Sequence, residues 1–329
     1  MASGGSLVEL MISLTLGQLL IGSALHGLST ARASLVSAET AARLQETALY
    51  ALAALETDLR MSGYLGLHDQ PALVTNLAGP LVDPLGGTVA LAGCSDAWAT
   101  NLARPVSGWD HAAGAWPLRA PCEPHGEWRS GSDGLVVKRA SADRIGQSAA
   151  ALRAWHRHAL VVSRREAALV YVGDDAGTVP GGYATSDPVG APPRADTRRL
   201  LVHAWYVSRD SSVADGYPSL RRKRLVAGPA VQDEEIMPGV EDLQLRWGVD
   251  ADGDGAADRY VDPGPLPDDA HVVAVQLWVR VRALERDAHW LEPARLRYAN
   301  LDETLPEAER RFRRTVVSRT VWLRNGGRT

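Results

Sequence analysis

The first thirty residues form an almost uninterrupted apolar run. Between Met1 and Ala31, Glu9 is the only side chain with a formal charge. As a helix at about 1.5 Å per residue, the run from Leu7 to Leu28 is roughly 33 Å long, enough to cross a hydrocarbon core of about 30 Å. A carboxylate inside such a helix is costly in a bilayer and tends to be functional. The pattern therefore predicts a membrane-inserted helix, over residues 5–29, with one functional carboxylate.

The apolar pattern becomes amphipathic over residues 30–64. Apolar side chains recur there at intervals of three, four or seven residues, which predicts a single apolar stripe on a helix. Gly63 is a suitable stop signal. The stripe comprises Leu35, Ala38, Ala42, Leu49, Leu52, Leu55 and Leu59, and the polar side comprises Arg32, Glu39, Arg43, Glu46, Glu56, Asp58 and Arg60. We therefore expect one continuous helix, with one half in a membrane and the other half packed on a domain.

The remainder of the chain divides at residue 134. Residues 65–133 are rich in Gly, Pro, Ala and Trp with weak periodicity, which indicates an irregular insertion. Beyond it, short β-rich runs bounded by turn or charged residues predict strands. These strands cover residues 135–140, 159–164, 168–172, 200–207, 219–226, 240–249, 271–281 and 315–323, with a loop over 173–197. The predicted fold class is α+β, with the long helix laid across an antiparallel sheet that occupies residues 134–329.

The strand over 271–281 shows the clearest alternation. Its inward face is predicted to carry Val273, Val275, Leu277, Val279 and Val281, and its opposite face Gln276, Trp278 and Arg280. Such alternation is typical of a strand with one buried face.

Composition is that of an ordinary folded protein, with 329 residues of which 45% are hydrophobic and 22% are charged. The net charge of −4 indicates no dominant polyanionic partner. Basic clusters at 221–224 and 310–314 are candidates for phosphate contacts. However, alternate residues of a strand face opposite ways, and Asp233, Glu234, Glu235 and Glu309 can offset them, so we predict no DNA binding. The sequence contains no serine elbow, Walker loop or zinc-protease helix, and nothing in it argues for catalysis.

Cys94 and Cys122 are the two cysteines of the chain. If the globular part lies outside the cytoplasm, a disulfide between them within the insertion is the simplest interpretation. Closing a loop of this size stabilises by about 3 kcal/mol on the chain-entropy model. A metal site is less favoured because no CxxC spacing exists.

An Asp-rich loop over residues 250–262 is the best candidate ligand site. Asp250, Asp252 and Asp254 stand at loop positions one, three and five, followed by Gly255, a spacing that curls oxygens around a hard cation such as calcium. Val261 replaces the usual glutamate at position twelve, so the loop is no EF-hand, and Asp258 is expected to supply the closing ligand. The alternative is a solvated Asp/Gly hairpin. His156 and His158 have no further ligands nearby in sequence and are not interpreted as a metal site.

The N-terminal segment Ser6-Leu7-Val8-Glu9-Leu10-Met11, preceded by Gly4-Gly5, resembles the prepilin signature of type IV pilins and type II secretion pseudopilins. The resemblance implies cleavage after Gly4 by prepilin peptidase and methylation of the new first residue, Gly5. It also implies that Glu9 pairs with the N-terminal ammonium of a neighbouring subunit and so sets the axial register. Two features depart from the family. Gly5 replaces the usual Phe or Met, and the leader lacks Lys or Arg. The alternatives are a plain anchor or a signal peptide cleaved near Ala24.

Three later segments resemble the PilW type of minor pilin: Pro218-Ser-Leu-Arg-Arg, Met237-Pro-Gly-Val-Glu-Asp-Leu-Gln and Arg319-Thr-Val-Trp-Leu-Arg-Asn. This resemblance implies a non-enzymatic protein that helps prime and cap a type IV pilus, serving adhesion and twitching motility. Its implied partners are the major pilin, other minor pilins, prepilin peptidase and a tip adhesin. The implied location is the inner membrane, with a periplasmic domain, and then the pilus tip. The alternatives are a type II secretion pseudopilin of the J kind and a membrane-anchored periplasmic calcium-dependent binding module or enzyme.

Overall fold

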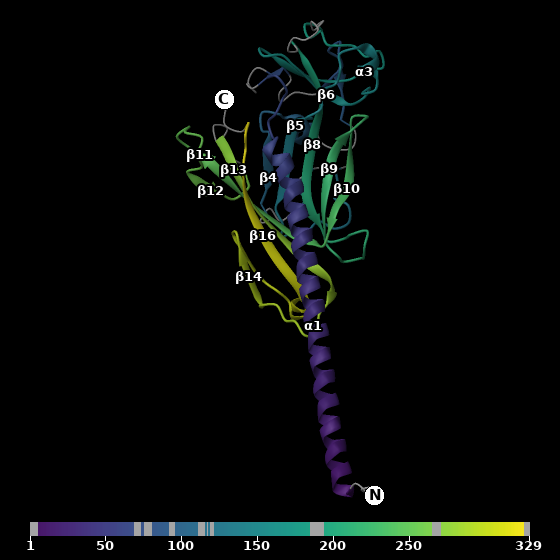
Figure 1. Cartoon of the computed structure of the whole chain (residues 1–329). Helices are drawn as coiled ribbons and strands as arrows, with labels where there is room; N and C mark the ends of the chain where they lie inside the picture. The colour runs from purple at the N-terminus through teal and green to yellow at the C-terminus, as the bar shows by residue number, and fades with distance from the viewer. Residues whose placement is uncertain are drawn as a thin grey trace.

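The structure is a computed structural model, and it describes residues 6–68, 74–75, 81–91, 96–110, 116, 118, 122–184, 194–264 and 271–325. Helix α1 (Leu7–Arg60) is a single helix of 54 residues whose N-terminal half projects beyond the β-rich part of the chain (Figure 1). The predicted continuous helix is confirmed. It ends at Arg60 instead of residue 64 because Met61 leaves helical geometry and Gly63 adopts a left-handed conformation, with φ of +72°.

The C-terminal half of α1 packs against the sheets through one face. That face begins at Leu44 and includes Leu44, Ala48, Ala51, Leu52, Leu55 and Leu59. The predicted apolar stripe is therefore wrong at Leu35 and Leu49, which are 69% and 43% exposed, and at the exposed Ala38 and Ala42. Leu35 precedes the part of the helix that meets the domain, and Leu49 lies on a side of the helix turned away from the buried face.

The polar side of α1 was also predicted wrongly at its end, since Asp58 and Glu56 are buried. Asp58 is only 3% exposed. Its carboxylate accepts hydrogen bonds from Arg139 Nη2 at 2.9 Å and Trp205 Nε1 at 3.1 Å, and lies 2.6 Å from His203 Nδ1. Glu56 forms an ion pair with Arg319. These contacts tie the last turns of the helix to three strands that lie far away in the sequence.

Eight of the described strands form the larger sheet. They are β1 (Val74–Thr75), β4 (Val106–Trp109), β5 (Gly134–Ala140), β6 (Ala159–Ser163), β7 (Ala168–Val172), β8 (Asp196–Ser208), β9 (Ser219–Val226) and β10 (Ala230–Pro238). The long strand β8 is central, because it pairs with β5, β6 and β9. The pairs are antiparallel except for β1 and β7, which run parallel.

A second sheet has four strands and is antiparallel throughout. Its order is β12 (Arg259–Val261), β11 (Val240–Asp250), β13 (His271–Arg286) and β16 (Phe312–Trp322). Two small hairpins join β2 (Leu81–Val82) to β3 (Thr88–Val89) and β14 (Arg295–Tyr298) to β15 (Leu301–Thr304). The short helices are α2 (Asp96–Thr100), α3 (Ala149–Arg153) and the 3₁₀ helix η3 (Glu307–Arg311).

The prediction of one antiparallel sheet is corrected to two larger sheets, and the chain crosses between them at Gly239. This residue separates β10 of the first sheet from β11 of the second, with φ of +87°. A Cβ at this position would lie 2.5 Å from the Tyr217 hydroxyl, so glycine is needed for both conformation and space.

One hydrophobic core joins α1 to both sheets. It contains the buried face of the helix and side chains from β5, β8, β9, β11, β13 and β16. Trp205 of β8 and Trp247 of β11 are among its largest fully buried or nearly buried members. Burying a large apolar side chain contributes about 1.5–3 kcal/mol, so this core is the main stabilising contact of the helix.

Every strand predicted from residue 134 onward is present, although several boundaries move. The predicted inward face of β13 is confirmed, since Val273, Val275, Leu277, Val279 and Val281 are all buried. Strand β10 was missed because its run Asp233-Glu-Glu hides any apolar alternation. The short hairpin of β14 and β15 was also missed. The predicted insertion 65–133 contains several short strands and α2, and its strand β4 extends the larger sheet through β5.

Replacing Asp58 with Asn should destabilise the protein by about 3 kcal/mol or more, because it leaves the partly buried Arg139 without its countercharge. Burial by itself raises the pKa of Asp58, but His203 and Arg139 outweigh it and hold the pKa below its ordinary value. The charge-dependent stabilisation is therefore present above about pH 4 and is lost as the pH falls through the lower folded pKa. Urea unfolding of the wild type and Asp58→Asn across this range measures both effects.

The matched control is Glu39→Gln, which removes an exposed carboxylate paired with Arg43 on the same helix. It should change stability by less than about 1 kcal/mol. Equal effects of the two substitutions would contradict the anchoring role of Asp58.

Candidate functional site

The N-terminal half of α1 exposes apolar side chains along its whole length. Leu7 is 76% exposed and Leu20 is 70% exposed. An 18-residue window of this helix has a mean hydropathy of 1.6, and none of it is buried within the fold. By length and composition, the helix is sufficient to cross a membrane. It is compatible with membrane anchoring.

The hydroxyl groups of this half are satisfied within the helix itself. Ser13 Oγ donates to the Glu9 carbonyl at 2.8 Å, Ser23 Oγ to the Leu20 carbonyl at 2.8 Å, and Thr30 Oγ1 to the His26 carbonyl at 3.0 Å. Thr15 and Ser29 make the same kind of bond. These polar groups therefore need no water, as an apolar environment requires.

Glu9 is different from these hydroxyl residues. It lies in the first turn of α1, where a negative charge interacts favourably with the helix dipole. Within the described part of the chain, no hydrogen bond or ion pair reaches its carboxylate. Gly4 and Gly5 lie outside the described residues, so processing between them stays a prediction. The geometry leaves Glu9 exposed and available to a cation from outside the chain.

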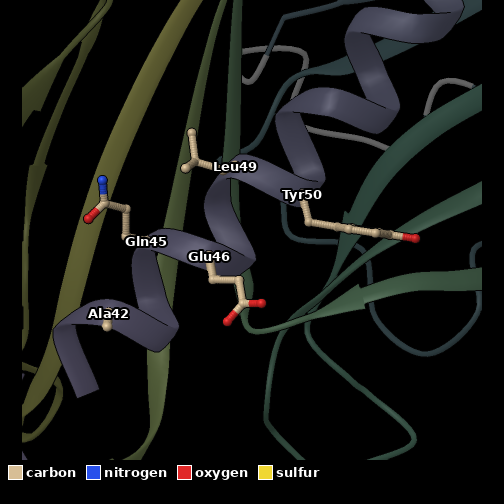
Figure 2. A pocket seen from close by; sticks show the side chains of 5 residues that line it. All are labelled: Ala42, Gln45, Glu46, Leu49 and Tyr50. Carbon is tan, nitrogen blue, oxygen red and sulfur yellow. The ribbon is translucent and has the colours of Figure 1, made fainter. Parts of the chain in front are cut away.

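An open hollow of about 540 Å³ lies along α1 where the helix meets the domain. Figure 2 shows the lining side chains on successive turns of the helix. They are Ala42, Gln45, Glu46, Leu49 and Tyr50. The spacing of three and four residues places them on one face of the helix. This second face is exposed, whereas the first packs against the sheets. The exposed Leu49 and Tyr50 give this face an apolar component.

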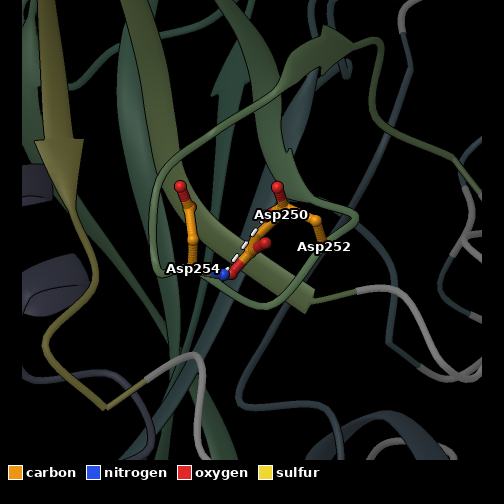
Figure 3. A group of neighbouring side chains, drawn as sticks. All are labelled: Asp250, Asp252 and Asp254. Atoms are coloured by element: carbon orange, nitrogen blue, oxygen red, sulfur yellow. Dashed lines mark hydrogen bonds between the residues drawn. The ribbon is translucent and has the colours of Figure 1, made fainter.

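The Asp-rich loop joins β11 to β12 and brings three of its four predicted ligands together. One carboxylate oxygen each from Asp250, Asp252 and Asp254 lies within 4.8 Å of the others (Figure 3). Asp258 is not in this group. Its Oδ2 accepts a hydrogen bond from the Ala251 N–H at 2.7 Å and closes the base of the loop.

Backbone N–H groups hold the three clustered carboxylates in place. Asp250 Oδ1 accepts from the Gly253 N–H at 2.7 Å and Asp250 Oδ2 from the Gly255 N–H at 2.9 Å. The Gly255 and Gly253 N–H groups lower the pKa of Asp250 despite the opposing effect of burial. Asp254 Oδ1 accepts from the Ala256 N–H at 2.7 Å. This all-oxygen donor set suits a hard divalent cation and has the right chemistry for calcium. It is equally the arrangement of a self-capped hairpin, and so calcium binding stays a prediction.

The first basic cluster lies on β9 and is matched by acidic residues on β10. Arg221 pairs with Asp233 at 2.8 Å, Lys223 with Asp233 at 2.9 Å, and Arg224 with Glu234 at 3.0 Å. The antiparallel register of β9 and β10 places Lys223 directly opposite Asp233, and Arg221 and Arg224 reach their partners diagonally. These ion pairs offset the positive charge that phosphate binding would need. This was expected of Asp233 and Glu234 from the sequence.

The second basic cluster spans η3 and the start of β16. Arg313 pairs with Asp287 at 2.7 Å, and Arg314 with Glu241 at 2.7 Å. Arg310 and Arg311 donate to backbone carbonyls. Both basic clusters are therefore engaged inside the fold.

A buried charge network escaped the sequence analysis. Arg280 is 0% exposed on the face of β13 that was predicted to be polar, and it pairs with Glu241 at 2.9 Å and Glu303 at 2.7 Å. Burial raises the pKa of Glu241, but Arg314, Arg280 and Arg129 outweigh it and bring that pKa to about 2. In the sequence, this network was signalled only by the position of Arg280 among the alternating valines of β13. The network is structural, since it joins β11, β13, β15 and β16.

The cysteine pair and the two histidines are the remaining candidate sites from the sequence. Cys122 is buried and is not a free thiol, but Cys94 lies outside the described residues, so their disulfide stays a prediction. His158 Nδ1 lies 3.2 Å from the His156 carbonyl, and neither histidine joins a group of potential metal ligands among the described residues.

Comparison with known proteins finds one family. Residues 204–325 match the family model PilW, described as type IV pilus-assembly protein W. The match covers less than half of the chain, from within β8 to just after β16, and contains all three segments on which the PilW resemblance was based. That resemblance is confirmed for this part of the chain, and it associates the chain with type IV pilus assembly. No curated protein and no solved structure matches the chain.

Proposed function

We propose that this chain is a minor pilin that helps to prime the assembly of a type IV pilus and to cap its tip. The observation that carries the proposal is an exposed apolar helix, free of the fold, attached to a sheet domain that matches PilW. A minor pilin needs both parts, because the helix packs among other subunits while the domain remains accessible. The proposed role is non-enzymatic and serves adhesion and twitching motility.

The proposed mechanism centres on the exposed half of α1. After prepilin peptidase removes residues 1–4 and the amine of Gly5 is methylated, the helix packs among those of the major pilin and other minor pilins. Glu9 then pairs with the N-terminal ammonium of a neighbour, and this pair fixes the axial register. The face at Ala42, Leu49 and Tyr50 extends the packing surface towards the domain.

Location follows from the same helix. Before assembly, the protein is anchored in the inner membrane by a single span, with its domain in the periplasm, where Cys94 and Cys122 can form their disulfide. After assembly, it lies at the pilus tip, where a tip adhesin is a proposed partner. The PilW match favours this machine over a type II secretion pseudopilin.

The intact mass of the protein from cells with and without prepilin peptidase tests the processing step. We expect loss of residues 1–4 and one added methyl group when the peptidase is present, and an uncleaved chain when it is absent. An uncleaved N-terminus in both strains would refute the pilin assignment and indicate a plain anchor. Cleavage near Ala24 would indicate a secreted protein.

Replacing Glu9 with Ala should reduce incorporation into pili by at least about tenfold, because the ammonium of the neighbour would lose a partner worth several kcal/mol in an apolar setting. The amount of protein in sheared pili, relative to the amount in membranes, measures this effect. Glu39→Ala is the matched control, since Glu39 is an exposed carboxylate of the same helix outside the apolar run. Similar incorporation of both variants and the wild type would show that Glu9 does not guide assembly.

We further propose that the β11–β12 loop binds calcium as a structural ion through Asp250, Asp252 and Asp254, with Asp258 closing the loop. Calcium at about one hundred times its dissociation constant should stabilise the fold by about 2.7 kcal/mol. The midpoint of thermal unfolding should therefore rise on adding calcium to chelator-treated protein.

The Asp252→Asn and Asp254→Asn variants should lose most of this calcium-induced rise. The matched control is Asp215→Asn, an exposed aspartate outside the loop, which should retain the rise in full. A midpoint that does not respond to calcium, or that responds equally in all variants, would identify the loop as a self-capped hairpin.

A further inference from the structure

A second pocket lies where α1 and β16 end, far along the fold from the projecting half of the helix. Its volume is about 410 Å³. It lies between the turn that follows α1, Arg165 of the β6–β7 turn, and the residues just after β16. Its lining comprises Gly63, Tyr64, Gly66, Leu67, His68, Arg165, Arg324 and Asn325. This volume is in the range of small-molecule binding sites.

Hydrogen bonds fix the walls of this pocket. The Gly63 N–H donates to the Lys138 carbonyl at 3.0 Å, and the Leu67 N–H donates to Ser163 Oγ at 2.9 Å. Asn325 Nδ2 donates to the Ser62 carbonyl at 3.0 Å. The three bonds connect the turn after α1 to β5, β6 and the end of β16. The pocket is therefore held open by the fold before any ligand arrives.

Glycine allows the turn to form one wall. Gly66 has φ of +93°, and a Cβ at this position would lie 2.4 Å from Ser163 Oγ. A side chain is thus excluded by both conformation and space. The backbone itself forms the pocket surface here and approaches β6 closely.

Two guanidinium groups set the charge of the pocket. Arg165 and Arg324 are exposed, and no carboxylate is among the lining residues. Within the described part of the chain, neither guanidinium takes part in a hydrogen bond or ion pair. Most of the other arginines in the described ranges are engaged. Arg198, for example, stacks over the Tyr64 ring at 5.2 Å but is paired with Asp196 at 2.6 Å.

We propose that this pocket binds an oxyanion, a carboxylate or phosphate group, through Arg165 and Arg324. The guanidinium fork matches the geometry of both groups and can hold each through two parallel hydrogen bonds. Because the cavity is much larger than one such group, the oxyanion is part of a larger molecule whose remainder contacts Tyr64, Leu67 and the glycine turn. This inference is independent of the proposed role in pilus assembly.

Isothermal titration of the full chain in a non-ionic detergent tests the proposal with two probes. These are inorganic phosphate and N-acetylalanine, and N-acetylalanine amide serves as the uncharged reference. At low salt we expect saturable binding of one oxyanion in a one-to-one ratio. Arg165→Gln and Arg324→Gln should each weaken it by at least about tenfold, the scale of one charge-assisted hydrogen bond.

Arg259→Gln is the matched control, because Arg259 is an exposed arginine on β12, outside the pocket. It should leave the affinity unchanged, and unfolding midpoints of all variants establish that the fold is intact. Binding of phosphate that needs both arginines supports a phosphate-bearing ligand, and the same result with N-acetylalanine supports a carboxylate. If neither oxyanion binds, or if binding survives loss of either arginine, the proposal is wrong.

Discussion

The carboxylate of Asp58 lies where α1 meets strands β5 and β8, and its partners fix how the helix sits on the larger sheet. A negative charge in the last turn of a helix is opposed by the helix dipole, and burial adds a further cost. Asp58 is stable there because Arg139, His203 and Trp205 surround it. The alanines and leucines of the buried face pack without strong directionality. The polar contacts of Asp58 define one rotation and one axial position, and thereby the direction in which the free half projects.

The local features of this chain were predictable from its sequence, whereas features that depend on distant partners were not. The long helix and the strands from residue 134 onward follow from runs and alternation of apolar residues. Three clustered carboxylates of the β11–β12 loop also follow from local spacing. Burial of Asp58 does not follow from local spacing, because its partners Arg139 and His203 lie 81 and 145 residues further along the chain. Without these partners, the pattern places Asp58 in solvent.

Strand β10 and the division into two sheets illustrate the same limit. The acidic run of β10 resembles a loop until the basic residues of β9 are placed across from it. In the ion pairs between the two strands, β9 supplies the basic residues and β10 supplies the acidic residues. Similarly, the Pro238-Gly239 pair is typical of a turn. The need for glycine where the chain crosses between the sheets comes from the distant Tyr217, whose hydroxyl leaves no space for a Cβ. Charge pairing is therefore a principal organiser of this arginine-rich domain.

The internal hydrogen bonds of the projecting helix have an energetic consequence for its change of surroundings. Its backbone and the hydroxyls of Ser13, Thr15, Ser23, Ser29 and Thr30 keep the same partners in lipid as in a bundle of protein helices. In the proposed move from lipid into a helix bundle, these groups would exchange almost no hydrogen bonds. In the proposed assembly, the transfer free energy of the helix then depends mainly on van der Waals packing and on the polar side chains of Glu9, Gln18 and His26. In the proposed assembly, the charge of Glu9 distinguishes a correctly aligned neighbour, which brings an ammonium group, from a lipid tail, which brings none.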